Sequence, residues 1–287
     1  MNRVYGALKH VTLVLLIILT NYPLYFMLQT SLKSNREMRE DFWRLPADPI
    51  WENYAAAFKS ILFDYTQFDW LCFIKTGAPL FNTMFVAFWS VCGVILFASL
   101  AAFAFARYDF ILKKPLYYVL LSLLMMPIVL IMVPEYVVVK SLGLLATRFG
   151  LILPYIAGSQ ALAVFMCRTF FEQIPKDLFE SAEIDGAGML RMYRHIAAPL
   201  SVPVLVVIGL LVCVQAWNDY IWPLVIVGSD EALYTVTIAM TAFQNEYNIE
   251  FGRLMAGFAI GSLPLVILIL SMLRYFIQGI TSGALKG

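Results

Sequence analysis

The sequence is poor in charge. Of its 287 residues, 14% are Asp, Glu, Lys or Arg, against about a quarter in soluble domains. The net charge is only +1, so there is no basic surface to attract nucleic acid. Because 61% of the residues are hydrophobic and the mean hydropathy is +0.79, the composition is that of an integral membrane protein.

Groups that crosslink chains, bind metals or catalyse reactions are also scarce. No GxxxxGK[ST], HExxH or GxSxG motif occurs, so the chain has no phosphate-binding loop and no recognisable hydrolase site. Its cysteines and histidines are too widely spaced for a disulfide framework or a structural zinc site. We therefore expect no catalytic residue, metal or cofactor in this chain. The cysteines and histidines are Cys72, Cys92, Cys167, Cys213, His10 and His195.

Long apolar windows dominate the rest of the sequence. A helix needs about 20 apolar residues to cross the hydrocarbon, and the chain is predicted to be one all-α integral membrane domain, residues 1–287, with six transmembrane helices. No small-residue cleavage site closes the first window, which is therefore predicted to be an uncleaved span. Pro23, Pro127 and Pro134 predict kinks or helix ends. The windows are 11–32, 79–106, 115–134, 150–167, 202–227 and 254–273.

Lysine and arginine in the short loops predict the orientation. The turn between the second and third windows holds Arg107, Lys113 and Lys114, and the positive-inside rule places it in the cytoplasm. With six spans, both termini and residues 170–200 then lie inside as well. Residues 33–78 form the largest extracytoplasmic segment, too short for an ordinary domain of about 100 residues. Its aromatic content predicts a small packed cap or an interfacial element.

Residues 170–200, FFEQIPKDLFESAEIDGAGMLRMYRHIAAPL, interrupt the apolar pattern. Pro175 and Asp177 suit the first turn of a helix ending near Asp185, and Gly186 suits the left-handed position that follows. A second helix is then predicted, with four residues on one face. The pattern alone supports two interpretations equally: a lipid-anchored interfacial helix and an element that binds a partner. The four residues are Met189, Met192, Tyr193 and Ile196.

Within residues 170–200, the segment ESAEIDGAGMLRMYRHIAAP resembles the EAA loop of bacterial ABC importer permeases. The pattern of that loop is E-A-A-x-x-D-G-A, followed by eight residues and then I-x-L-P. Ser181 and Ala198 replace an alanine and a leucine of that pattern. LPADPIWENYAAAF, FNTMFVAF, AAFAFARYDF and QAWNDYIWPLVIV extend the resemblance over nearly the whole chain. RTFFEQIPKDLFESAEIDGA is similar to the carbohydrate-importer branch, close to the inner-membrane permeases of the maltose-type system. The matching residues are Glu180, Ser181, Ala182, Asp185, Gly186, Ala187, Ile196 and Pro199.

The resemblance implies the type I ABC importer permease (MetI-like) fold in the bacterial inner membrane, importing a sugar by alternating access. Its partners would be a second permease subunit forming a heterodimer, two ATPase subunits that bind ATP and Mg, an extracytoplasmic substrate-binding protein, and membrane lipid. The EAA helices would sit in a groove of the ATPase. Glu180 would supply a polar contact, Gly186 the turn, and the four-residue face the packing. Gln244 and Asn245 are similar in position to the tip of a loop that contacts the binding protein.

The segment QAWNDYIWP places an acid within the fifth window. Asp219 there costs about 2.5 kcal/mol or more unless it faces protein or water. Gln215 and Asn218 share its helical face, with Trp217 and Tyr220 adjacent, so these five residues are candidates for a sugar-binding translocation path. An aromatic belt with a helix–helix hydrogen bond is the interpretation the sequence favours. A self-contained secondary transporter or channel, with Asp219 as an ion-coupling site, is a further alternative.

Overall fold

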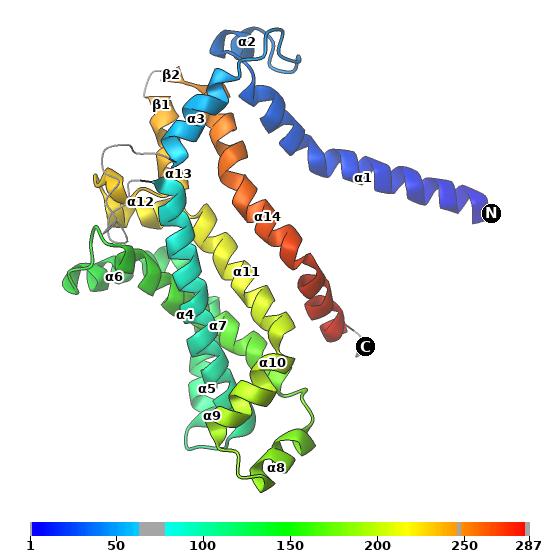
Figure 1. Ribbon diagram of the computed structural model, residues 1–287, viewed down its shortest axis with the longest axis vertical. Coiled ribbons are helices and arrows are strands. Elements are labelled where there is room, and N and C mark those ends of the chain that lie inside the picture. The colour runs from blue at the N-terminus through cyan, green and yellow to red at the C-terminus, as the bar shows by residue number, and fades with distance from the viewer. Residues whose placement is uncertain (1, 63–77, 246–247, 285–287) are drawn as a thin grey trace.

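The computed structural model describes residues 2–62, 78–245 and 248–284, and they form an elongated, almost entirely helical molecule (Figure 1). Helices α2 and α3 lie at one end of it, and α8 lies at the other. The elements are α1 Asn2–Ser31, α2 Asn35–Glu40, α3 Glu52–Leu62, α4 Pro79–Arg107, α5 Lys113–Ser122, η1 Leu123–Met125, α6 Ile128–Ser141, α7 Arg148–Phe171, α8 Lys176–Ile184, α9 Met189–Met192, η2 Tyr193–Ala197, α10 Ala198–Leu200, α11 Val202–Asn218, α12 Ile221–Val227, η3 Glu231–Leu233, α13 Val236–Ala239, η4 Met240–Phe243, β1 Gln244–Asn245, β2 Asn248–Ile249 and α14 Phe251–Ala284.

The described helices account for the six predicted windows. Four are long and apolar enough to cross a membrane by themselves: α1, α4, α7 and α14. Two more candidates are bent pairs, α5 with α6 at 108° and the α9–α10 segment with α11 at 78°. The count is six when each bent pair is taken as one span. The predicted all-α membrane fold is confirmed, with the two-residue pairing of β1 and β2 as a small addition.

Two windows differ from single continuous helices: the third breaks at a proline that predicts a kink or helix end, and the fifth breaks beside the acid within it. The third is interrupted at Pro127, which is extended (φ −62°, ψ 127°) and precedes α6. Proline lacks the N–H that a continuing helix would use. The fifth ends at Asn218, because Asp219 is extended (φ −70°, ψ 129°) and α12 starts only at Ile221. Pro23 and Pro134, in contrast, lie inside α1 and α6.

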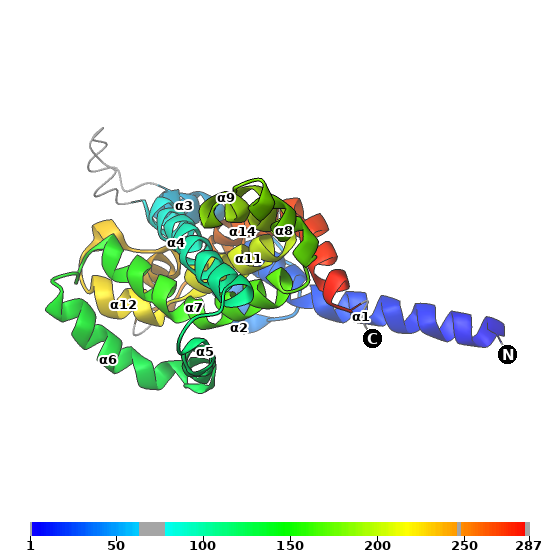
Figure 2. The same cartoon turned by 90° about the horizontal axis from the view of Figure 1, so that it is seen from below.

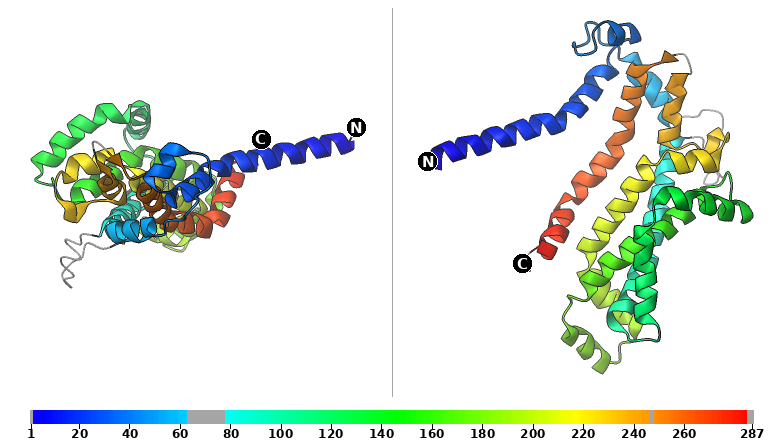
Figure 3. Two further views of the ribbon diagram at one scale, coloured as in Figure 1. Left: turned by 90° about the horizontal axis from the view of Figure 1, so that it is seen from above. Right: turned by 180° about the vertical axis from the view of Figure 1, so that it is seen from behind.

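Helices α4, α7 and α11 form the central bundle, which runs between the two ends of the molecule (Figures 1 and 3). Small side chains at the contact let the backbones approach closely, as is common between membrane helices. Ala98 and Ala102 of α4 and Ala163 of α7 are buried in one core cluster. A Cβ at Gly93 of α4 would overlap the side chain of Ile156 on α7. The bundle therefore places the end of α4 directly beside the elements that follow α7.

Helix α1 diverges from this bundle and projects away from it (Figures 1 and 2). It contacts α14, yet no residue of its most apolar stretch is buried within the chain. Its side chains, such as Ile17 and Leu19, are largely exposed. Apolar surface on this scale needs lipid or another protein to cover it.

The described residues after α1 combine features of both predicted alternatives, a packed part around Lys33 and exposed aromatic side chains at Trp43 and Trp51. Lys33 is 1% exposed, and its Nζ donates to the carbonyls of Asp41 (3.3 Å) and Phe42 (3.0 Å). Ser34 and Glu37 form a capping box at α2, and backbone amides of Ser34 and Ala47 lower the pKa of the Glu37 carboxyl. Helix α3 packs on α14. The aromatic-rich residues 63–73, with Cys72, lie outside the described residues.

Candidate coupling loop and buried polar site

The EAA loop, residues 170–200, lies at the α8 end of the molecule (Figure 1). Helix α8 begins after Pro175 and ends before Asp185, as the sequence predicts. Gly186 has a φ of +78°, the left-handed conformation that glycine adopts without strain. The N–H of Gly186 donates to the carbonyl of Glu183, and the N–H of Ala187 donates to that of Ala182. The predicted helix and glycine turn are confirmed.

The second half of the loop is α9, a π-helical turn at residues 193–197 and α10. Of the four residues predicted to share a face, Met192 is 4% exposed and lies in the core cluster. Tyr193 and Ile196 are half-buried against the same cluster. Met189 is 44% exposed. Three of the four thus pack on this chain's own helices, and only Met189 faces outward.

Sequence reasoning missed the apolar residues that are exposed on this loop. Ile184 is 88% exposed and Leu190 is 69% exposed, one on each side of the glycine turn, and Leu178 is exposed on α8. The signal for them was an apolar side chain on the polar side of each predicted amphipathic helix. Exposed apolar groups clustered about a rigid turn are typical of a protein-binding surface.

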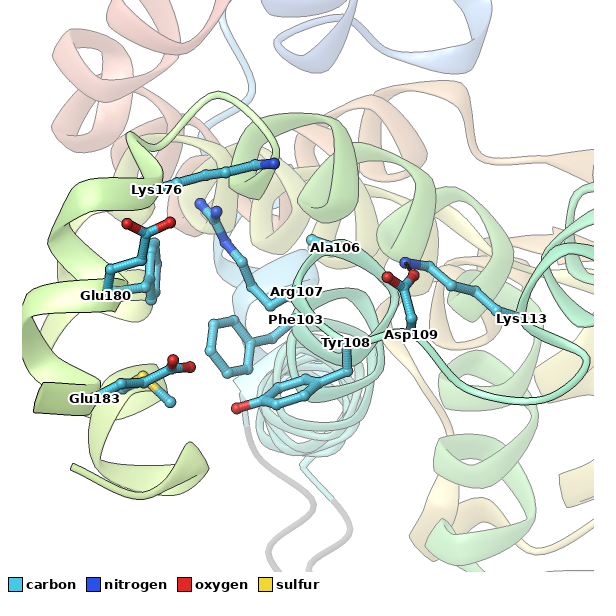
Figure 4. A pocket seen from close by; sticks show the side chains of 11 residues that line it. Phe103, Ala106, Arg107, Tyr108, Asp109, Lys113, Lys176, Glu180 and Glu183 are labelled. Carbon is cyan, nitrogen blue, oxygen red and sulfur yellow. Dashed lines mark hydrogen bonds and ion pairs between the residues drawn. The ribbon is translucent and has the colours of Figure 1, made fainter. Parts of the chain in front are cut away.

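A hollow of about 410 Å³ lies between α8 and the end of α4 (Figure 4). Glu180, Glu183 and Lys176 line it from α8, and Arg107 and Tyr108 line it from the other side. Burial and the charge of Glu183 raise the pKa of the Tyr108 phenol. The hollow places the Glu180 and Glu183 carboxylates at an open surface of the EAA loop.

Asp219 joins three elements at the other end of α11. Its Oδ2 accepts a hydrogen bond from the Tyr155 hydroxyl of α7 (2.9 Å), and its Oδ1 accepts from the backbone N–H of Trp222 (3.3 Å). Thr237 donates to its carbonyl oxygen (2.7 Å). The carboxylate therefore caps α12 and holds it to α7, the helix–helix hydrogen bonding that the sequence favoured.

The other translocation-path candidates do not form one cluster with Asp219. Trp217 is buried, and its indole N–H donates to the Gly261 carbonyl (3.1 Å). Gln215, Asn218 and Tyr220 are exposed, and the Asn218 amide donates to its own helix. The two amides thus share an outer face, while the Trp217 ring points into the protein.

The candidates for a binding-protein contact lie in the short β-ribbon. Gln244 is exposed in β1 and pairs with Ile249 of β2. Asn245 pairs with Asn248. The residues between the two strands, 246–247, lie outside the described residues.

Broken membrane helices around a central bundle, with an exposed helix–turn–helix at one end, define a polytopic α-helical membrane protein. Comparison with known families gives the class. Residues 94–282 match the family of binding-protein-dependent transport system inner membrane components, and the chain belongs to this family. It is a multi-pass protein of the cytoplasmic membrane and a permease rather than an enzyme. Membership sets aside the self-contained secondary transporter and channel.

Similar proteins span nearly the whole chain. The probable ABC transporter permease protein YurM of Bacillus subtilis (strain 168) is 31% identical, over 96% of this chain and 87% of its own. The melibiose/raffinose/stachyose import permease MelC of the same organism is 34% identical, over 92% of this chain and 91% of its own length. The same fold occurs in the crystal structure of a bacterial ABC transporter involved in the import of the acidic polysaccharide alginate. The TM-score with one of its chains is 0.76 at 21% identity, over 96% of this chain and 97% of that one.

Proposed function

We propose that this chain is a permease subunit of an ATP-driven, binding-protein-dependent importer that moves a carbohydrate by alternating access. The observation that carries the proposal is the EAA loop, a helix–turn–helix with exposed apolar residues, in a chain without a nucleotide-binding motif. Similar proteins are named for import of melibiose, raffinose and stachyose, of diacetylchitobiose and of arabinooligosaccharides. An oligosaccharide is accordingly the proposed substrate.

The loop is proposed to face the cytoplasm and to dock on one of two ATPase subunits, which bind ATP and Mg. Ile184 and Leu190 would supply the apolar contact, since burying one such side chain is worth about 1.5–3 kcal/mol. The Glu180 carboxylate would supply a polar contact beside it. The turn at Gly186 would pass on displacement because a buried side chain anchors the helix on each side of it, Phe179 on α8 and Met192 on α9.

The rest of the assembly follows from the same orientation. Both termini would be cytoplasmic, and residues 33–78 would be extracytoplasmic. The projecting helix α1 would be covered by a second permease subunit and lipid. Gln244 and Asn245, in the β-ribbon near α3, would lie on the side where the substrate-binding protein docks. The exposed Gln215, Asn218 and Tyr220 would face the translocation path, with Asp219 and Trp217 supporting it from behind.

Two measurements test this proposal. A photo-crosslinking amino acid at position 184 should form a covalent product with the ATPase in native membranes. The same amino acid at the exposed Leu270 of α14 should not. The cognate binding protein should be stabilised against heat by a neutral sugar in a panel of raffinose, trehalose, diacetylchitobiose, sn-glycerol 3-phosphate and amino acids. Stabilisation only by an amino acid would refute the carbohydrate assignment.

A further inference from the structure

Three residues of α4 contact the EAA loop from a single face of that helix. Ser99, Phe103 and Arg107 are spaced four residues apart, so they lie on successive turns in one line. We call them the α4 stripe. Their contacts overlap and together cover both halves of the loop, although the loop is joined through the chain to α7 and α11.

Arg107 holds the first part of the loop. Its Nη2 donates to the carbonyls of Phe171 and Ile174, both at 2.7 Å. Its guanidinium carbon lies 3.9 Å from the centre of the Phe179 ring of α8, and Figure 4 shows the side chain between α4 and α8. Charge-assisted hydrogen bonds are stronger than neutral ones, and a cation is favourable at the carboxyl end of α7. One side chain thereby fixes the end of α7, the linker and α8.

Phe103 contacts the loop on both sides of the glycine turn. It is fully buried, with ring centroids 6.0 Å from Phe179 of α8 and 5.7 Å from Tyr193. Its ring also meets Phe171 edge-on at 5.9 Å. Aromatic pairs at these separations are favourable. The two helices of the loop are therefore packed around the same ring.

Ser99 holds the second part of the loop. Its hydroxyl lies 2.6 Å from the hydroxyl of Tyr193, at the start of the π-helical turn. The two junctions through the chain differ. The backbone N–H groups of Gln173 and Ile174 donate to carbonyls at the end of α7, whereas α10 meets α11 at a 78° bend at Ser201. Hinges form at such element ends. The loop is therefore held from α4 on both sides of the glycine turn, and the bend at Ser201 is the candidate hinge.

We propose that the α4 stripe fixes the EAA loop and the adjoining end of α7 to the second span, so that ATPase-driven movement of the loop is delivered first to α4 and α7 rather than to α11. Arg107 is the positioning residue in this arrangement. The inference rests on the proposed function of the loop as the ATPase-coupling element.

Distance measurements test the rigid attachment. In the complete complex, with the four native cysteines replaced, spin labels are placed at Asp177 of α8 and at the exposed Phe97 of α4, or at Asp177 and the exposed Leu211 of α11. On binding a non-hydrolysable ATP analogue, the 177–97 distance should stay unchanged and the 177–211 distance should shift. Arg107→Gln should broaden the 177–97 distribution. A changed 177–97 distance with a fixed 177–211 distance would overturn the proposal.

A second test measures the stimulation of ATP hydrolysis by the binding protein in lipid nanodiscs. Arg107→Gln should lower this stimulation about tenfold, because two charge-assisted bonds are lost, and Arg107→Lys should restore part of it. Arg168 is the matched control. It also ends a span, but its guanidinium lies 3.8 Å from the ring centre of Tyr117 on α5 and pairs with Glu172. Arg168→Gln should keep near-normal stimulation.

The outcomes separate this inference from the function on which it rests. Normal stimulation in an assembled Arg107→Gln complex would overturn the inference and leave the importer intact. Should Arg107→Gln fail to assemble, Ser99→Ala removes the contact with Tyr193 together with the hydrogen bonds of the Ser99 hydroxyl to carbonyls of its own helix. Unchanged stimulation and distances in that variant would overturn the proposal equally. A wild-type preparation without any ATPase would overturn the proposed function, and the inference with it.

Discussion

Replacing Gly186 with alanine changes one backbone conformation and little else. The φ of Gly186 is +78°, and a Cβ added there would meet no atom within 4 Å. The cost is therefore the strain of a left-handed L-residue, about 1–2 kcal/mol. Because 1–2 kcal/mol is a factor of about 5–30 in an opening equilibrium, amide hydrogen exchange in the turn should accelerate by that factor.

The assay follows the amide hydrogens of Asp185, Gly186 and Ala187, which donate to carbonyls of α8. Gly186→Asn should have a smaller effect, since asparagine tolerates this conformation better. Gly188→Ala adds the same methyl group two residues on, where φ is −73°, and should change exchange less than Gly186→Ala does. Equal acceleration by the two alanine variants would refute the argument that the left-handed turn holds the loop rigid.

Four further outcomes are expected. Gly252→Ala should lower the melting temperature in detergent, because its Cβ would overlap the Asn53 amide and the Lys33 carbonyl. A Cβ added at Gly158 would meet no atom within 4 Å, so Gly158→Ala should leave the melting temperature unchanged. The pKa of Glu37 is lowered below its ordinary 4.5, so the stability it contributes is fully present above that pH and is lost as pH falls through the lowered pKa. Glu37→Gln should flatten the pH dependence of melting in that acidic range. Asp219→Ala leaves two donors without an acceptor and should lower the melting temperature more than Tyr155→Phe, which removes one hydrogen bond. Ile184→Asp should preserve chain stability, because the side chain is exposed, but should reduce ATPase retention during purification.

Local signals in the sequence predicted local structure well. Pro175 and Gly186 gave the bounds of α8 because helix starts and left-handed turns depend on the residues themselves. Pro127 was predicted as a kink or helix end and interrupts the third span. Asp219 was predicted only as an acid within the fifth window, and the helix ends directly before it. Of the predicted face of the second helix, Met192, Tyr193 and Ile196 lie together against this chain's own core, whereas Met189 is exposed. A helical pattern shows which residues lie together, not which neighbour they meet.

Contacts between distant residues were outside the reach of sequence patterns. From the sequence, Arg107 was identified only as a positive charge in a short loop between spans. The backbone carbonyls that it binds lie 64 and 67 residues away. Asp219 was correctly favoured as a hydrogen-bonded residue, yet its partner Tyr155 is 64 residues distant. The sequence around Lys33 does not indicate that its ammonium group is buried and donates to two backbone carbonyls. Each of these depends on how the helices pack, which composition and spacing do not determine.

The composition of the complex tests the central claim most directly. The tagged chain should be extracted from its native membrane in mild detergent, and the proteins that accompany it should be quantified by mass spectrometry. The account predicts one second permease subunit and two ATPase subunits for each copy of this chain. A chain that is purified alone from those membranes and still transports a sugar into vesicles would contradict it.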